Sequence, residues 1–172
     1  TRADNMTAHI VNALLERNPQ VDASMVEDII LGCGNPEGAQ GHNIARNVAV
    51  LSNLPIETGG ITVNRYCSSG LNSIAMAATQ SQSGFSDCII AGGVESISTS
   101  QGHTNMHMYV NEDLAANAPG IYHAMGTTAE AVAQRYDVSR EAQDEYALSS
   151  QQRCAAAQDA GRYDDEIIPM AT

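Results

Sequence analysis

Residues 59–71 read GGITVNRYCSSGL, and the passage from a β-branched run into a helical pattern within this stretch decides the fold. The run 61–64 follows two glycines and has the composition of a short strand. Beyond it, apolar residues recur at helical spacing until the chain nears Gly84, as Leu71, Ile74, Ala75 and Ala78. The chain is therefore predicted to pass from strand to helix at Cys67.

The same alternation of elements continues on both sides of this stretch. Apolar spacing predicts a helix over 6–17, and the run 26–31, which ends in Gly-Cys-Gly at 32–34, predicts a strand. A second helix is predicted over 44–51, and residues 87–93 have the composition of a third strand. Helices alternating with strands indicate an α/β fold, with a mostly parallel sheet covered by helices on both faces.

The chain changes character after residue 96. Residues 97–124 are rich in Ser, Gly, His, Met and Asn without a steady period, which predicts a structureless functional excursion. Thr127 and Glu130 have the spacing of a capping box, and Ser139 stands before a second helical stretch that runs to Gly161. Residues 166–169 are strand-like. We therefore expect a core over 1–96 and the start of an inserted loop domain over 97–172.

Composition excludes several classes of function. Twenty acidic and eight basic residues give a net charge of −12, and the basic residues are scattered arginines, so a nucleic-acid partner is not expected. The apolar runs are far shorter than the roughly 20 residues that a membrane span needs. The four cysteines show no Cys-x-x-Cys pair, so neither a metal site nor a disulfide framework is predicted. No targeting segment is visible, and a cytoplasmic location is expected, with an organelle possible if a segment was lost.

One cysteine occupies a position suited to chemistry. Cys67 lies at the predicted strand-to-helix junction, where unpaired amides and the helix dipole favour a thiolate and can bind an oxyanion. Cys33 and Cys88 lie in apolar strand runs and Cys154 in an Ala-rich helix, where a thiol packs as a small apolar side chain. Position alone leaves buried packing open for Cys67 as well.

The residues around Cys67 resemble a known family. Residues 63–71, VNRYCSSGL, closely resemble the nucleophile segment of thiolases, which are also called acetyl-CoA acyltransferases. Residues 92–96, GGVES, resemble the family's next strand end, and residues 125–130, MGTTAE, resemble its pocket-lining turn. Residues 139–144 and 164–169 match later stretches, so the resemblance covers nearly the whole chain in the family's order.

The resemblance implies a layered thiolase-like fold and a ping-pong acyl transfer. Cys67 would carry the acyl group, and Met125 would line the acyl-thioester pocket. The implied reaction is thiolytic cleavage of a 3-ketoacyl-CoA, or the reverse condensation, with coenzyme A as substrate and no permanently bound cofactor. A homodimer or tetramer is implied through residues 61–66. His123 is assigned no contact, and Glu95 and Ser96 are interpreted as structural.

The chain also lacks parts of the family's pattern. Thiolases have a second, similar half with Asn-Glu-Ala-Phe, Gly-His-Pro and Cys-x-Gly segments, and none of these occurs here. The first strand of the N-terminal half is missing too. The interpretation is that this chain is the N-terminal half and is inactive alone.

Other interpretations remain open. Residues 32–38, GCGNPEG, suggest a dinucleotide-binding turn, although the glycine spacing is off by one and Pro36 and Glu37 are unfavourable to a pyrophosphate. His103 and His107 have the spacing of two metal ligands but no obvious third. The chain could also be another condensing enzyme of the same fold, similar to ketoacyl synthases, or a non-catalytic fragment that binds acyl-CoA or dimerises.

Overall fold

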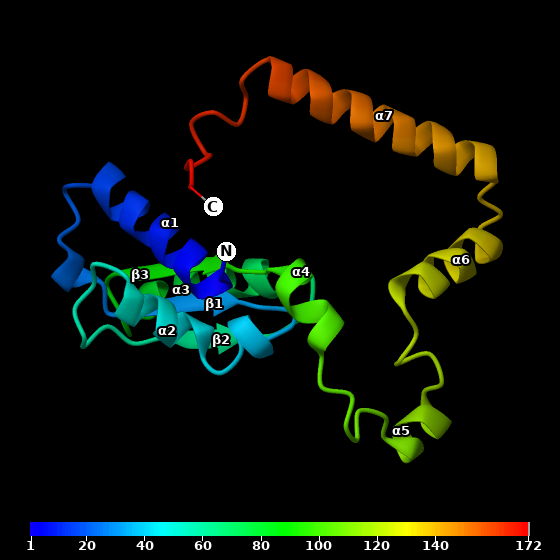
Figure 1. The fold of residues 1–172 in the computed structure, drawn as a ribbon, viewed down its shortest axis with the longest axis horizontal. Helices are drawn as coiled ribbons and strands as arrows, with labels where there is room; N and C mark the ends of the chain where they lie inside the picture. Colours follow the sequence, from blue (N-terminus) through cyan, green and yellow to red (C-terminus); the bar gives the residue numbers. More distant parts are fainter. Residues whose placement is uncertain (172) are drawn as a thin grey trace. The chain divides into compact units, whose positions relative to one another are not determined.

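A computed structural model describes residues 1–171, which form two compact units (Figure 1). Unit 1 comprises residues 1–105 together with the segment that begins at Ile168, and unit 2 comprises residues 106–167. The division expected from composition, between residues 96 and 97, stays a prediction.

Unit 1 contains a parallel three-stranded sheet. Strand β1 (Asp28–Gly32) pairs on one side with β2 (Ile61–Val63) and on the other with β3 (Ile89–Gly93), giving the order β2-β1-β3. In this register Ile30 lies between Ile61 and Ala91. The predicted α/β class with a parallel sheet is confirmed.

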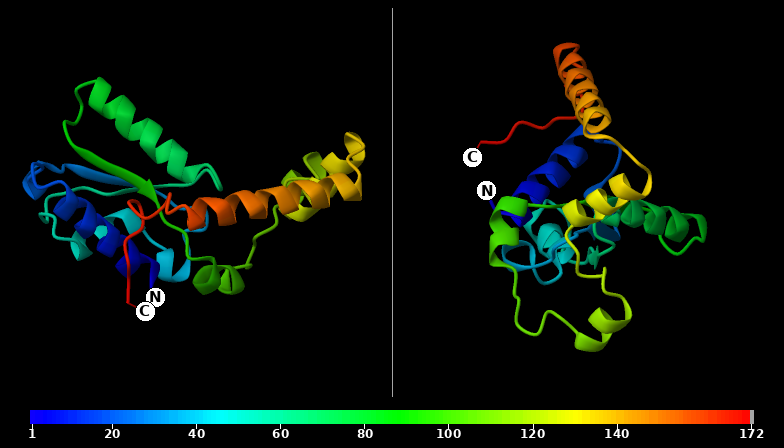
Figure 2. Two further views of the ribbon diagram at one scale, coloured as in Figure 1. Left: turned by 90° about the horizontal axis from the view of Figure 1, so that it is seen from above. Right: turned by 90° about the vertical axis from the view of Figure 1, so that its right-hand side faces the viewer.

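Helices cover the two faces of this sheet. Helices α1 (Ala3–Arg17) and α2 (Ile44–Leu51) lie on one face and α3 (Ser69–Gln82) lies on the other (Figure 2, left). The connection through α2 runs from β1 to β2, and the connection through α3 returns past β1 to β3. Because crossovers between parallel strands are right-handed, this reversal of direction moves the second helix to the opposite face.

The core lies mainly between β1 and the α1–α2 layer. Ile29 and Leu31 of β1 pack there with Val11 of α1 and with Ile44 and Val48 of α2. Ile30 points to the α3 face and is also fully buried. β1 is therefore apolar on both sides, as expected for the central strand of a covered parallel sheet.

The prediction that residues 97–124 are structureless is wrong in part. Helix α4 (Ile97–Ser100) and a 3₁₀ turn at Gln101–His103 follow β3, and α5 (Glu112–Asn117) lies in unit 2. The Asn111 side chain accepts the Leu114 amide at 2.9 Å and begins α5. Short polar side chains bound to nearby backbone thus support helical turns in a segment without apolar periodicity.

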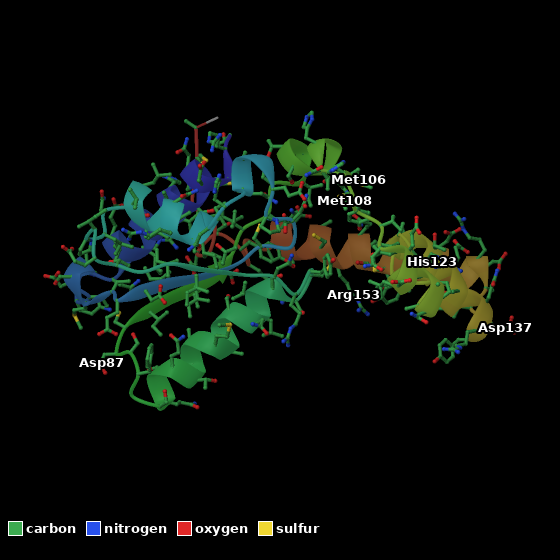
Figure 3. The ribbon with its side chains drawn as sticks, turned by 90° about the horizontal axis from the view of Figure 1, so that it is seen from below. Asp87, Met106, Met108, His123, Asp137 and Arg153 are labelled. Atoms are coloured by element: carbon green, nitrogen blue, oxygen red, sulfur yellow. The ribbon has the colours of Figure 1, made fainter. Side chains whose placement is uncertain are left out.

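Unit 2 also contains α6 (Met125–Arg135) and α7 (Arg140–Asp159). The prediction that Thr127 caps α6 is wrong, because the helix begins two residues earlier and its N-cap, Ala124, makes no side-chain cap. α6 ends where Asp137 adopts a left-handed backbone, with φ of 51° (Figure 3). α7 begins as predicted, with the Ser139 hydroxyl accepting the Ala142 amide at 3.2 Å.

The strand predicted over residues 166–169 is not formed. The amides of Glu166 and Ile167 both donate to the Tyr163 carbonyl, so the chain turns instead of pairing with the sheet. Within unit 1, the Pro169 carbonyl lies 2.9 Å from His9 Nε2 of α1. Among residues 1–171 no helix has both the length and the apolar character that crossing a bilayer requires.

Ser139, which caps α7, and Thr127, which caps no helix, can be compared by substitution. Ser139→Ala removes the α7 cap and is expected to cost about 1 kcal/mol of local stability, which should speed hydrogen exchange of the Ala142 amide by about fivefold. Thr127→Ala, the matched control, removes a hydroxyl that caps no helix end and should leave α6 exchange unchanged. Faster exchange of the α6 amides in the control would show that Thr127 does cap that helix.

Candidate active site

The candidate site lies where the three parallel strands of unit 1 end. Gly34 follows β1, Cys67 follows β2 and Glu95 follows β3, so segments far apart in sequence meet at one edge of the sheet. In open parallel sheets this carboxyl edge is the usual place for a ligand. Cys67 is exposed here.

Cys67 lies in a tight turn between β2 and α3. β2 ends at Val63 and α3 begins at Ser69. The helix therefore begins two residues after Cys67, where the sequence predicted the strand to pass into the helix. Side chains close the turn: Asn64 Oδ1 accepts the Tyr66 amide at 2.8 Å, and Ser69 Oγ accepts the Arg65 amide at 2.8 Å. These local hydrogen bonds use residues that sequence analysis assigned to the strand and helix ends.

Tyr66, directly before Cys67, has a left-handed backbone with φ of 46°. Such a conformation costs a bulky residue roughly 1 kcal/mol or more. The Tyr66 carbonyl compensates by accepting both the amide of Ser69 at 3.0 Å and its hydroxyl at 2.5 Å. Cys67, the next residue, is exposed, whereas Ser69, which closes the turn, is buried.

Glycines allow the turn to sit directly on the sheet. A Cβ on Gly32 would lie 2.2 Å from the Ser69 carbonyl carbon and 2.4 Å from the Gly70 nitrogen. A Cβ on Gly93 would lie 3.3 Å from the Gly70 Cα. The backbones of β1, β3 and the start of α3 therefore approach one another more closely than side chains permit.

Cys67 opens into a cleft of about 570 Å³ within unit 1. Its walls come from the end of β1, the Cys67 turn and the segment after β3, namely Gly32, Gly34, Asn35, Tyr66, Cys67, Ser69, Gly70, Gly93, Val94, Glu95, Ile97 and Gln101. An exposed thiol in a cleft at the strand ends is a geometry suited to attack on a bound carbonyl compound.

A polar network that the sequence analysis did not assemble lies at the base of this cleft. Glu95 accepts the Gly34 amide at 2.7 Å, and its second oxygen accepts the side-chain amide of Gln40. Gln40 is fully buried and also accepts the Ser96 amide at 2.8 Å. Gln40 ends a 3₁₀ turn (Gly38–Gln40) in a stretch without apolar periodicity, so its sequence surroundings contain no signal of this role.

The remaining cysteines differ in their surroundings. Cys33 is buried directly after β1, and burial, with the nearby Glu95 carboxylate, raises the pKa of its thiol to about 11. Cys88 is half-buried before β3. The prediction that Cys154 packs as a small apolar residue is wrong, because α7 exposes it to solvent. Among the fully described cysteines, only Cys67 lines the cleft.

Two other candidate residues belong to unit 2. Met125 is the first residue of α6, and its side chain is 70% exposed. His123 precedes it by two residues, in a turn closed by its own amide and the Gly120 carbonyl (Figure 3). The contribution of Met125 to an acyl pocket stays a prediction.

Two alternative ligand sites were considered, a dinucleotide-binding turn at residues 32–38 and a metal site at His103 and His107. After the glycines at 32–34 the chain forms only a 3₁₀ turn at Gly38–Gln40, and α2 begins at Ile44, so no helix N-terminus follows this turn directly, as a dinucleotide fold requires. His103 ends the 3₁₀ turn after α4. Within residues 1–171, no group of three or more His, Cys, Asp or Glu side chains is arranged to hold a metal ion.

Comparisons with known proteins agree with this geometry. The family model described as "Thiolase, N-terminal domain" matches residues 1–172. The chain is 46% identical over 171 residues to a 3-ketoacyl-CoA thiolase of Bacillus subtilis and 41% identical over 168 residues to one of Shewanella loihica. It is also 40% identical over 186 aligned residues to a beta-ketoadipyl-CoA thiolase of Acinetobacter baylyi.

These matches cover nearly all of this chain but only part of each relative. They include 98%, 96% and 98% of the chain, in the order given, and 43%, 42% and 46% of the relatives. The chain thus spans less than half the length of these relatives. Because the family model extends over all 172 residues, the chain belongs to the thiolase family and corresponds to its N-terminal domain.

Proposed function

We propose that this chain supplies the nucleophile of a thiolase that cleaves 3-ketoacyl-CoA with coenzyme A, or condenses two acyl-CoA molecules in reverse. The observation that carries the proposal is the exposed Cys67 thiol, held in a strained turn at the start of α3 and facing a cleft at the strand ends. Membership of the thiolase family supports the class of reaction.

In the proposed reaction the Cys67 thiolate attacks the 3-keto carbon, and the carbonyl oxygen becomes an oxyanion. The bond between carbons 2 and 3 then breaks, which leaves the acyl group on Cys67 and releases the enolate of acetyl-CoA, which takes up a proton. The thiol of coenzyme A gives up its proton to a base as its sulfur attacks the acyl thioester, and Cys67 leaves as the thiolate that began the cycle. Two half-reactions through a covalent intermediate give ping-pong kinetics.

We propose that other parts of the protein complete the site. The reaction requires a base for the Cys67 thiol, a donor for each oxyanion and an acid for the enolate. Within the described cleft the titratable side chains are Tyr66, Cys67 and Glu95, and both Glu95 oxygens are already bonded. We assign these tasks to a second half of the kind that thiolases have, and Met125 to the acyl pocket wall.

We also propose a homodimer or tetramer that forms through residues 61–66. β2 lies at one edge of the described sheet, and its three residues are half-buried, so a second strand can pair there. This strand leads directly into the Cys67 turn, and pairing would hold that turn. Light scattering of the full-length protein tests this assembly.

We also propose that the enzyme is located in the cytosol, in keeping with four free thiols.

A turnover assay tests the proposed function. The full-length protein is expected to consume acetoacetyl-CoA only when coenzyme A is present, followed as loss of the enolate absorbance. The 172-residue chain alone is expected to show at most one slow acylation of Cys67. A full-length protein that binds acyl-CoA without consuming it would favour a non-catalytic fragment, and decarboxylative condensation of a malonyl thioester would favour a ketoacyl synthase-like enzyme.

A further inference from the structure

The network under the Cys67 cleft has a defined hydrogen-bond polarity. The Ser96 amide is a donor, so the Gln40 atom that faces it must be the oxygen, at 2.8 Å. The Gln40 nitrogen then faces the Asn35 carbonyl at 2.6 Å and the Glu95 carboxylate. Because both of these partners are acceptors, the orientation of the buried Gln40 amide is fixed by its surroundings.

This orientation requires two acceptor oxygens on residue 95. One Glu95 oxygen receives the Gln40 nitrogen, and the other receives the Gly34 amide at 2.7 Å. The Cys33 thiol, 4.0 Å from Glu95, is a further weak donor on the same side. A glutamate offers an acceptor oxygen to each of these donors, whereas a glutamine would turn its NH₂ group toward one of them and leave that donor without an acceptor.

The network also reaches the backbone that presents Cys67. Gly34 lies against the Tyr66 carbonyl, since a Cβ on Gly34 would be 3.3 Å from that oxygen and 2.9 Å from Glu95 Oε2. The same Tyr66 carbonyl closes the turn through Ser69. Glu95 therefore holds Gly34 beneath Tyr66, and Gln40 ties this arrangement to the segment after β3.

We infer that Glu95, oriented by the buried Gln40, is a positioning residue for the nucleophile. It fixes Gly34 and thereby the strained Tyr66–Cys67 backbone, and it joins two walls of the cleft. It acts through Gly34 and the turn and is assigned no step of the reaction. The inference rests on the proposed function of Cys67 and adds to it the group that maintains the geometry of the turn.

The test compares two glutamates in the full-length protein. Glu95→Gln keeps the side-chain size but replaces one acceptor with a donor, so a donor must face a donor within the network. Glu27→Gln is the control for the loss of a carboxylate at the opposite end of the strands. Glu27 also accepts two donors, Ser86 Oγ and the Asp87 amide, but both at Oε2, so the oxygen of a glutamine there can still accept both. Thermal unfolding of both variants measures the structural cost of each change.

Glu95→Gln is expected to lower kcat for acetoacetyl-CoA thiolysis by at least about tenfold, since small misplacements of a nucleophile have large effects on rate. KM should stay within about threefold of the parent value, because Glu95 is assigned no contact with the substrate. The rate of Cys67 alkylation by iodoacetamide, divided by that of the exposed Cys154 in the same protein, should fall by at least about threefold. Glu27→Gln should leave kcat and the alkylation ratio unchanged.

Several outcomes decide the inference. Unchanged kcat and an unchanged alkylation ratio in Glu95→Gln overturn it, as does an equal loss in Glu27→Gln. If Glu95→Gln does not fold, Gln40→Met provides the second test. It removes the donor to Glu95 at similar side-chain volume, and it must lower kcat in the same direction. If the parent protein lacks thiolysis, the proposed function fails, while the alkylation ratio still decides whether Glu95 positions Cys67.

Discussion

Cys67→Ser in the full-length protein is expected to abolish thiolysis, with a fall in kcat of at least about a thousandfold. The substitution changes one atom, but an alcohol ionises far less readily than a thiol and is a much weaker nucleophile at neutral pH. Cys67 is exposed at the cleft, so the fold should tolerate serine without loss of packing. The measurement is steady-state consumption of acetoacetyl-CoA in the presence of coenzyme A.

Cys154→Ser is the matched control for this variant. Cys154 is also exposed but lies on α7 in unit 2, and its replacement should leave kcat unchanged. Mass spectrometry of the quenched reaction should detect an acyl group on the peptide with Cys67 and none on the peptide with Cys154. Activity of Cys67→Ser within tenfold of the parent would refute the assignment of the nucleophile.

Gly32→Ala is expected to have a large effect on both stability and activity. The added Cβ would lie 2.2 Å from the Ser69 carbonyl carbon, and backbone atoms cannot rotate away as a flexible side chain can. Either β1 or the start of α3 must shift. The expected cost is about 3 kcal/mol in the free energy of unfolding, and kcat should fall by about a hundredfold as the Cys67 turn moves.

Gly102→Ala is the control for the general effect of replacing a glycine. Its Cβ would meet no atom within 4 Å, and the residue is exposed, so both stability and kcat should stay near the parent values. Urea unfolding followed by circular dichroism measures the first quantity and the thiolysis assay the second. Parent-like stability of Gly32→Ala would contradict the close approach of β1 and α3.

Sequence patterns identified the regular elements where local signals and burial agreed. The predicted helix over 44–51 has those bounds in the structure, because its apolar face is buried and Asn43 accepts the Arg46 amide to begin it. Ser139 was identified correctly from the local signal alone, because its hydroxyl accepts the Ala142 amide while α7 has no buried residue. The Thr127 box failed because α6 has its N-cap at Ala124, three residues before Thr127, without a side-chain cap.

The candidate site was predictable only in part. The junction at Cys67 followed from the run of β-branched residues and the helical spacing after it, and the thiolase resemblance rests on residues 63–71. Neither signal indicated that Tyr66 is left-handed or that Ser69 supplies both the donor and the acceptor that close the turn. These features depend on hydrogen bonds between backbone groups whose positions the flanking elements set.

By itself the sequence determined that strands and helices alternate, that the segment forming β1 is apolar on both sides and that a thiol stands where β2 passes to α3. These properties follow from periodicity and residue type within short windows. Only the tertiary structure decided that β1 lies between β2 and β3, and that Gly34, Glu95 and Gln40 meet beneath Cys67. The physical reason is that strand order and the pairing of buried polar groups are set by contacts between segments far apart in the sequence, such as Ile30 with Ile61 and Gly34 with Glu95, which no local pattern encodes.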